Sequence, residues 1–330
     1  MLKESLIPTQ LIKPTERGSI TIDEIASEDR LRIGYLIAQA CMLGAQLLWL
    51  KLRGKAEPVT VGKLLARFFQ QMGVLWIKMG QLLSLRLDIL PAAVCDELSK
   101  LQDQAHGFNP ELSRQLIEED LGAPVEHYFT DFCSIPFAAA SISQVHKARL
   151  RNGGAWVAIK VRKPDAHKTF VRDITVIRWL VAKLSQWSIQ PHMRWQDMLW
   201  EVEQLMAEEL DYNYEIANIR RMKKVLSRHN IYVPKVFSHY CSERVLVMEF
   251  IHGVVMADYL KVAASDPLRL KAWCEENNVE PRRLGKRLFF SNLRQLFEDN
   301  LFHGDLHPGN IVLLRDSRIA FIDLGSIGFS

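Results

Sequence analysis

The segment from residue 303 to residue 325 constrains this chain most, because three of its polar residues stand at a spacing that suits one kind of chemistry. It reads HGDLHPGNIVLLRDSRIAFIDLG. Asp305, Asn310 and Asp323 have the order and spacing of a kinase catalytic loop followed by a metal-binding turn. Phosphoryl transfer needs a carboxylate to orient or deprotonate the nucleophile, and an amide plus a second carboxylate to hold Mg²⁺. We assign the first role to Asp305 and the metal roles to Asn310 and Asp323.

Two apolar runs between Asn310 and Asp323 indicate how these two side chains meet. Ile311–Leu314 and Ile319–Ile322 flank a polar stretch, a pattern that predicts two strands joined by a turn. Such a hairpin brings Asn310 and Asp323 to the same end, where a hard cation finds two oxygen ligands. The alternative is that Asp305 is only a turn residue. That interpretation would be preferred for an Asp-Leu-Gly sequence alone, but the spacing of all three polar residues favours the kinase-like assignment.

An upstream β-rich run, Trp156–Val161, carries a single lysine, Lys160. In a kinase the corresponding strand supplies the lysine that contacts the α- and β-phosphates and pairs with a helix glutamate. Before it, where a kinase has its glycine-rich phosphate loop, alanine takes the glycine positions. The nucleotide-contacting residues expected there are Ala138, Ala139, Ala140 and Ser141. Alanine restricts the backbone and adds methyl groups, so nucleotide handling should differ from that of an ordinary protein kinase.

Two further segments make the pattern more specific. Ile77–Pro91 carries a Lys-x-Gly-Gln signature, and Glu208–Asn218 carries a Glu-x-Asp signature. Together with the catalytic loop, these segments resemble the UbiB-like family of atypical kinases, which assist ubiquinone biosynthesis in bacteria and mitochondria. Neither signature occurs in ordinary kinases.

The resemblance implies an α+β, two-lobed protein-kinase-like fold with a helical N-terminal extension, and binding of ATP or ADP with Mg²⁺. In the family the Lys-x-Gly-Gln helix packs over the mouth of the active site and its lysine meets the Glu-x-Asp carboxylates. Here this would join Lys78 to Glu209 and Asp211. Lys78 and Gln81 lie three residues apart and therefore share a helix face. We predict that these four residues gate the site, although a solvated lysine would be the simpler interpretation without the carboxylates.

Two glutamates are candidates for the partner of Lys160. Glu215 lies four residues after Asp211, so these two share a helix face while Glu209 points elsewhere. We assign Glu215 to Lys160 and leave Glu209 and Asp211 to Lys78. The exchange, with Glu209 beside Lys160, stays open from sequence alone.

Composition excludes several classes of protein. With 330 residues, of which 48% are hydrophobic, the chain can bury one large core or two lobes. Its net charge of +4 is small, and no basic block is interleaved with aromatic residues, so nucleic-acid binding has no support. The five cysteines are widely spaced and include no Cys-x-x-Cys pair, which indicates a reducing compartment and neither disulfides nor zinc.

The N-terminal region bears on location. It lacks the form of a signal peptide, and its acidic residues argue against a mitochondrial transit peptide, which favours a bacterial cytoplasm. The uncharged stretch Ile33–Leu50 approaches the length that spans a bilayer. Gln39 and Gln46 favour a helix that is buried or lies in the interface. We expect a protein on the inner face of the cytoplasmic membrane, with a lipid or ubiquinone-biosynthesis proteins as further partners; the oligomeric state stays open.

Patterns along the chain divide it into parts. Residues 1–30 are expected to form a polar, loosely ordered lead, and residues 31–127 a helical extension that carries the Lys-x-Gly-Gln helix. Residues 128–250 are expected to form the small lobe, and residues 251–330 the start of the large lobe. The chain stops five residues after Gly325, so we expect an incomplete large lobe.

Three local patterns complete these expectations. Apolar residues recur at helical spacing from residue 64 to residue 83, and residues 195–225 read as one helix. The strand over residues 244–250 runs into a segment placed like a kinase hinge. Met248 would then border the adenine pocket, or else is a plain core methionine.

Together these observations favour an ATP-binding, Mg²⁺-dependent atypical kinase or ATPase that supports ubiquinone biosynthesis. If Lys78 and Gln81 occlude the substrate groove, water becomes the acceptor and hydrolysis is favoured over protein phosphorylation. A small-molecule kinase of the aminoglycoside or choline type is one alternative, but it gives no reason for the Lys-x-Gly-Gln segment. A nucleotide-gated scaffold without useful turnover is the other.

Overall fold

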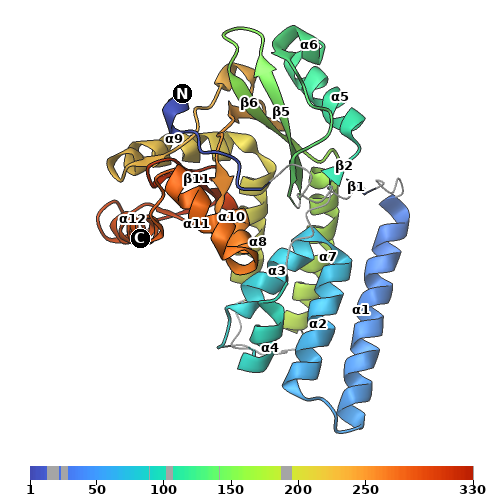
Figure 1. The fold of residues 1–330 in the computed structure, drawn as a ribbon. Helices are drawn as coiled ribbons and strands as arrows, with labels where there is room; N and C mark the ends of the chain where they lie inside the picture. The colour runs from blue at the N-terminus through green and yellow to red at the C-terminus, as the bar shows by residue number, and fades with distance from the viewer. Residues whose placement is uncertain are drawn as a thin grey trace.

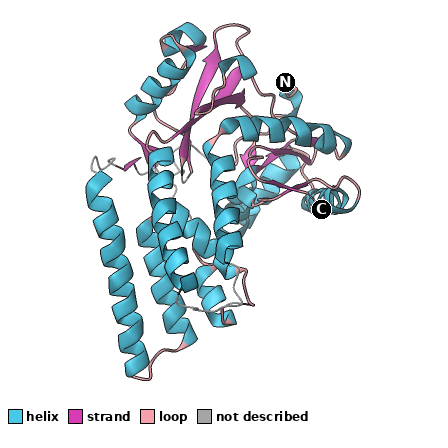
Figure 2. Cartoon of the chain, turned by 180° about the vertical axis from the view of Figure 1, so that it is seen from behind, coloured by secondary structure: helices cyan, strands magenta, loops and turns pink. Residues whose placement is uncertain are grey.

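A computed structural model of the chain describes residues 1–12, 22–23, 29–88, 90–101, 107–140, 142–186 and 195–329. A group of long helices extends from a part in which two β-sheets and the remaining helices gather (Figure 1). Seen from behind, the strands lie above and the long helices below (Figure 2). The predicted mixed α+β architecture with N-terminal helices is confirmed.

The extension is built from helices that pack side by side. They are α1 (Asp29–Leu52), α2 (Pro58–Met72), α3 (Val74–Ser84), α4 (Ala92–Leu98), α7 (Ala166–Gln186) and α8 (Trp195–Leu210). One hydrophobic core joins them, and Trp76 and Leu98 are buried at its centre. The structure therefore packs α7 and α8 with the extension, whereas the sequence placed them in the small lobe.

The apolar stripe predicted over residues 64–83 is divided between α2 and α3 at Gly73. The φ of +102° at Gly73 is a conformation that L side chains rarely adopt, so the helix cannot continue through it. Gly80, the glycine of the Lys-x-Gly-Gln signature, permits a close helix crossing. A Cβ there would lie 2.5 Å from Leu101 Cδ1 and 2.8 Å from Phe69 Cδ2.

The small-lobe sheet has the order β3-β5-β6-β8, with β4 pairing to β5. Its strands are β3 (Phe129–Thr130), β4 (Ala138–Ala139), β5 (Ser143–Leu150), β6 (Trp156–Arg162) and β8 (Val245–Glu249). Covering it are α5 (Pro110–Leu121) and α6 (Val125–Tyr128), while β1 (Ile22–Asp23) pairs with β2 (Gly107–Phe108). Ile117 of α5 and Phe108 are buried in the sheet's core, so residues 107–127 pack with this lobe rather than with the extension.

The large-lobe sheet has the order β7-β12-β11-β9. Its strands are β7 (Ile231–Tyr232), β9 (Val254–Val255), β11 (Ile311–Leu314) and β12 (Arg318–Phe321), and β10 (Phe302–His303) pairs separately with β13 (Ile327–Gly328). The helices around it are α9 (Tyr212–Arg228), α10 (Met256–Ser265), α11 (Pro267–Glu276) and α12 (Pro281–Phe297), with short 3₁₀ turns η1 (Glu4–Leu6), η3 (Ser238–Tyr240) and η4 (Pro308–Asn310). The strand β7, which the sequence placed in the small lobe, pairs in parallel with β12.

The first twelve residues are not the loosely ordered lead that was expected. Leu11 is 2% exposed and belongs to the core of the large lobe. The indole N–H of Trp273 donates to Thr9 O at 2.8 Å. The prediction failed because backbone groups and a single leucine make these contacts, and neither leaves a periodic pattern.

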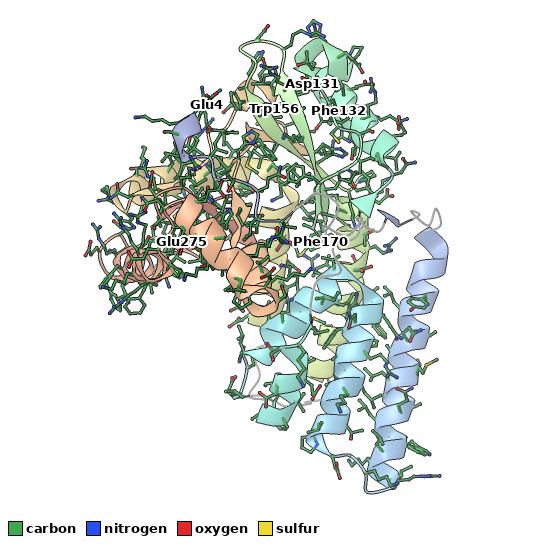
Figure 3. All side chains as sticks on the ribbon, viewed as in Figure 1. Glu4, Asp131, Phe132, Trp156, Phe170 and Glu275 are labelled. Carbon is green, nitrogen blue, oxygen red and sulfur yellow. The ribbon has the colours of Figure 1, made fainter. Side chains whose placement is uncertain are left out.

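Helix α1 lies at the outer edge of the extension and buries little of its surface. Among the described residues, Gly34–Leu52 is long and apolar enough to cross a membrane by length and composition, with a hydropathy of 1.3 and 11% of its residues buried. Its side chains are drawn in Figure 3, and few of them are buried. The large exposed apolar ones are Tyr35, Ile37, Met42, Leu48, Trp49 and Leu52.

We expect Gly80→Ala to destabilise the protein by about 1–3 kcal/mol, because its new methyl group must displace the side chains of Leu101 and Phe69. Gly285→Ala is the matched control: nothing lies within 4 Å of its Cβ position, so the change should be neutral or stabilise α12 by up to about 1 kcal/mol. Urea unfolding measures both. Equal stabilities for the two variants would contradict the close crossing.

Candidate active site

Lys160 stands at the centre of the site, between two carboxylates. It lies in β6, in register with Val145 of β5 and Leu246 of β8, so its backbone is held in the middle of the sheet. Its ammonium nitrogen lies 2.9 Å from Glu215 Oε2 and 3.1 Å from Asp323 Oδ2. The side chain of Glu215 is 5% exposed and that of Asp323 is 40% exposed. The predicted pairing of Glu215 with Lys160 is confirmed.

In this cluster, burial and the neighbouring charges of opposite sign shift the pKa values of Lys160, Glu215 and Asp323 in opposite directions. Burial alone would lower the pKa of Lys160, but the carboxylates of Asp323 and Glu215 outweigh it and raise that pKa well above its ordinary value. Burial raises the pKa of Glu215 to about 7, although the ammonium opposes the rise. Burial also favours neutral Asp323, but Lys160 and the Gly325 N–H, 3.0 Å from Asp323 Oδ1, hold the pKa of Asp323 below its ordinary value.

The β11–β12 hairpin brings Asn310 and Asp323 together, as the apolar runs predicted. Ile311 pairs with Phe321, and the N–H of Ile322 donates to Asn310 O at 3.1 Å, so Asp323 follows directly beside Asn310. The Asn310 Nδ2 donates to the Asp305 carbonyl oxygen at 3.1 Å, which fixes the amide so that its oxygen points away from that carbonyl.

The donor set at this end of the hairpin fits Mg²⁺. Mg²⁺ prefers oxygen ligands and is usually held by one or two protein groups together with substrate phosphates. Asn310 and Asp323 provide an amide oxygen and a partly exposed carboxylate. In the described part of the chain, no group of three His, Cys, Asp or Glu side chains is arranged to hold a metal ion by itself. These residues therefore suit a metal that arrives with a nucleotide.

The loop before the hairpin holds the backbone of Asp305 and leaves its carboxylate open to solvent. The N–H of Asp305 donates to His303 Nδ1 at 3.1 Å, and its carbonyl accepts from the His307 N–H at 3.0 Å and from Asn310 Nδ2 at 3.1 Å. Burial lowers the pKa of His303, which favours the neutral ring that accepts this bond. The Asp305 side chain is 63% exposed. The loop thus presents a carboxylate on a fixed backbone.

The segment predicted as one helix over residues 195–225 is two helices that meet at Asp211. Asp211 has an extended backbone, and its carboxylate accepts the N–H two residues on at 2.8 Å as the N-cap of α9. The break resets the helical phase, so Glu209 and Glu215 reach different partners. Glu209 lies 2.9 Å from the ammonium of Lys78. The pairing of Glu209 with Lys78 is therefore confirmed, whereas Asp211 lies outside the helix that carries Glu215; a contact of Asp211 with Lys78 stays a prediction.

Lys78 and Gln81 both lie on α3, as predicted, and connect it to different segments. The Lys78–Glu209 ion pair joins α3 to α8, and Gln81 Nε2 donates to Leu101 O at 3.1 Å. The ion pair is partly exposed, so it contributes only about 0–1 kcal/mol to stability. These contacts fix the orientation of α3, and the gating role stays a prediction.

The alanine segment forms a tight turn between two strands. Ala138 and Ala139 form β4, and the N–H of Ala140 donates to Ser143 O at 2.8 Å. Ser141 lies outside the described residues. Contact of this segment with phosphate stays a prediction.

Gln144 anchors this turn, and the sequence-based predictions missed it. It is fully buried; its Oε1 accepts from the Phe108 N–H at 2.8 Å and its Nε2 donates to Ser113 Oγ at 2.7 Å. The turn is thereby tied to α5. An amide among the apolar residues of a strand was the available signal.

The structural role of Asn218 was also missed, because its position in the sequence fits an amide on the surface of a helix equally well. It is 8% exposed, and its Nδ2 donates to Gly325 O at 3.1 Å. Asn218 follows Glu215 by three residues, so the same face of α9 contacts Lys160 and the turn that carries Asp323. The helix thus fixes both the strand lysine and the turn that carries Asp323.

Met248 lies in β8, in register with Ala158, and is 8% exposed. Residues 250–253, which we call the hinge, connect β8 to β9. The N–H of Phe250 donates to Trp156 O at 3.0 Å, so the hinge begins on the edge of the small-lobe sheet. A role for Met248 beside adenine stays a prediction.

A strand lysine that pairs with a helix glutamate and with the aspartate of an Asp-Leu-Gly turn has the arrangement of a kinase-like site. The family model described as "ABC1 atypical kinase-like domain" matches residues 100–330. The chain therefore belongs to this family of atypical kinases, as the resemblance to UbiB-like proteins predicted.

Individual relatives agree with the family match. A "Probable protein kinase UbiB" of Erwinia tasmaniensis is 34% identical over 322 residues, covering 94% of this chain and 54% of the relative. A protein of the same description from Providencia stuartii is 36% identical over 289 residues, covering 85% and 50%. The chain spans about half the length of these curated relatives.

A solved structure shares the fold. Rv3197 of Mycobacterium tuberculosis, solved as a complex with erythromycin, is 25% identical with a TM-score of 0.53, covering 90% of this chain and 67% of that chain. The kinase-like fold with N-terminal helices is thereby confirmed.

Replacing Asp323 by Asn should lower the pKa of Glu215 below about 7, because the charge of Asp323 helps to raise it while Lys160 remains. In the parent, Glu215 binds its proton more tightly folded than unfolded. Its contribution therefore reduces stability progressively as pH rises from its ordinary pKa of 4.5 to about 7. Carboxyl ¹³C NMR titration of both proteins measures the shift. An unchanged or higher Glu215 pKa in Asp323→Asn would show that the two carboxylates do not share the lysine.

Proposed function

We propose that this chain binds ATP with Mg²⁺ and acts as an atypical kinase or ATPase. The observation that carries the proposal is the Lys160 ammonium, 2.9 Å from Glu215 and 3.1 Å from Asp323, which in turn lies beside Asn310. Membership of a kinase-like family supports ATP binding. The surplus of carboxylate over ammonium in the cluster also suits a site that receives a divalent cation.

Each side chain then has a separate task. Lys160, oriented by Glu215, would bind the α- and β-phosphates, and Asn310 and Asp323 would hold Mg²⁺. Bound Mg²⁺ would neutralise charge on the phosphates. Asp305 would orient the acceptor. Its exposure gives an acceptor access to this carboxylate, and we propose water as the acceptor if Lys78 and Gln81 occlude the substrate groove.

We expect Asp323→Asn to reduce Mg²⁺-dependent phosphate release by about two orders of magnitude or more, because a bound metal contributes several kcal/mol to stabilisation of the transition state. Asp316→Asn is the matched control, since Asp316 is an exposed residue in the turn at the opposite end of the same hairpin. It should keep the activity of the parent. Phosphate release and nucleotide binding are measured with and without Mg²⁺.

The same assay separates the alternatives. Turnover that appears only with an amino alcohol or a sugar would establish a small-molecule kinase, although the Lys78–Glu209 ion pair gives the Lys-x-Gly-Gln segment a place that this class does not need. Nucleotide binding without turnover, in parent and variants alike, would establish the scaffold.

We further propose a role in ubiquinone biosynthesis at the inner face of the bacterial cytoplasmic membrane, with a lipid or biosynthetic proteins as partners. Relatives described as UbiB support the role. The location is supported by α1, whose apolar side chains are exposed on a helix that is 11% buried over Gly34–Leu52.

Charge on α1 should weaken membrane association. We expect Leu48→Glu with Trp49→Glu to lower binding to lipid vesicles by about tenfold or more, because each apolar side chain transferred from water contributes about 1.5–3 kcal/mol. Leu260→Glu with Leu268→Glu is the control, since these exposed leucines lie on α10 and α11. Vesicle co-sedimentation measures both pairs. Equal losses would argue against α1 as the contact.

A further inference from the structure

Residues 1–12, which we call the N-terminal strap, run across the kinase-like part far from the helix α1 that follows them in sequence. In Figure 1 the strap is the blue segment beside α9, and Figure 3 labels Glu4 on it. Its hydrogen bonds join three places: the end of β8, the turn between β11 and β12, and the C-terminal end of α11.

The first contact lies immediately before the hinge. The Leu2 N–H donates to Glu249 Oε1 at 2.7 Å. Glu249 is the last residue of β8 and is 5% exposed; its Oε2 accepts from the Tyr232 hydroxyl at 2.8 Å and from the Lys235 N–H at 3.1 Å. The Leu2 side chain packs in a cluster that includes Ile251 of the hinge. The strap therefore supplies a backbone donor to a buried carboxylate, and its Leu2 packs against the same apolar cluster as Ile251 of the hinge.

The last contact lies at the end of α11. Asn277 is 1% exposed; its Oδ1 accepts from the Thr9 N–H and its Nδ2 donates to Thr9 Oγ1, both at 2.8 Å. The buried Trp273 donates its indole N–H to Thr9 O at 2.8 Å. Buried polar groups without partners are strongly disfavoured, so these groups hold the strap in one register.

The middle of the strap contacts the hairpin of the candidate site. The N–H of Arg315, in the turn between β11 and β12, donates to Leu6 O at 2.9 Å. The other end of this hairpin carries Asn310 and Asp323. The strap is thus bonded at one end to Glu249, immediately before the hinge, and at Leu6 and Thr9 to the large lobe.

We propose that the strap positions the hinge for the adenine base of the nucleotide. By bonding Glu249 and packing against the cluster of Val312, Leu314 and Ala320 that Ile251 also contacts, while anchored at Asn277, it fixes the hinge backbone relative to the large lobe. This inference rests on the proposed function, because it takes the hinge as the place where the base binds. Leu2 and Glu249 are positioning residues, since they act through the hinge backbone.

The test replaces one strap residue in the full chain. Leu2→Asp sets a second carboxylate beside Glu249 and removes the apolar contact, so the strap should leave the hinge. Ser5→Asp is the matched control, because it adds the same charge at an exposed position three residues away. Leu98→Ala, in the core of the extension, serves as a variant with lowered stability but an intact strap.

Binding of adenosine and of inorganic tripolyphosphate separates the base from the phosphates. We expect Leu2→Asp to weaken adenosine binding by about fivefold or more, the scale of an ordinary coupling between sites, and to leave tripolyphosphate binding unchanged. Ser5→Asp and Leu98→Ala should bind both probes as the parent does. Equal weakening of both probes in Leu2→Asp, or the same loss in Leu98→Ala, would overturn the inference in favour of general destabilisation.

Amide hydrogen exchange tests the strap without any nucleotide. In Leu2→Asp we expect faster exchange for residues 1–9 and for residues 249–253, and parental exchange in Ser5→Asp. Fast exchange confined to the strap, with the hinge as protected as in the parent, would overturn the inference. A parent chain that binds no nucleotide would sink the proposed function, while this measurement would still decide whether the strap holds the hinge.

Discussion

The interaction on which the site depends is that of one buried ammonium on the small lobe with two carboxylates on the large lobe. Lys160 lies on the small-lobe sheet, Glu215 on α9 and Asp323 after the large-lobe hairpin, and 3.1 Å or less separates the ammonium from each carboxylate. Because burying these charges unpaired would be very unfavourable, the three elements must stay together. Asn218 strengthens the arrangement by bonding α9 to Gly325.

The helical extension connects to the Lys160 cluster through the break between α8 and α9 at Asp211. In a continuous helix the angle between the directions of the Glu209 and Glu215 side chains would be fixed. Because Asp211 ends one helix and caps the next, α8 and α9 can take different orientations. Glu209 then meets Lys78 on α3 and Glu215 meets the strand lysine. A movement of α3 would therefore be transmitted through α8 to the start of α9, the helix that carries Glu215.

Predictions from sequence succeeded where local pattern determines structure. The apolar runs around residues 315–318 gave the hairpin, and the glutamate spacing gave the partner of Lys160. They failed where distant contacts decide. The position of the strap depends on Asn277, which lies more than 250 residues away in sequence. The packing of α7 with the extension depends on a core that no single segment reveals. The break at Asp211 depends on one N-cap residue within an otherwise helical pattern.

The most direct test of this account is a crystal structure with Mg²⁺ and a non-hydrolysable ATP analogue. It should show Lys160 on the phosphates with its Glu215 pair intact, Asn310 and Asp323 on the metal, and the base against residues 250–253. A nucleotide bound elsewhere, with Lys160 still bridging Glu215 and Asp323, would contradict the account.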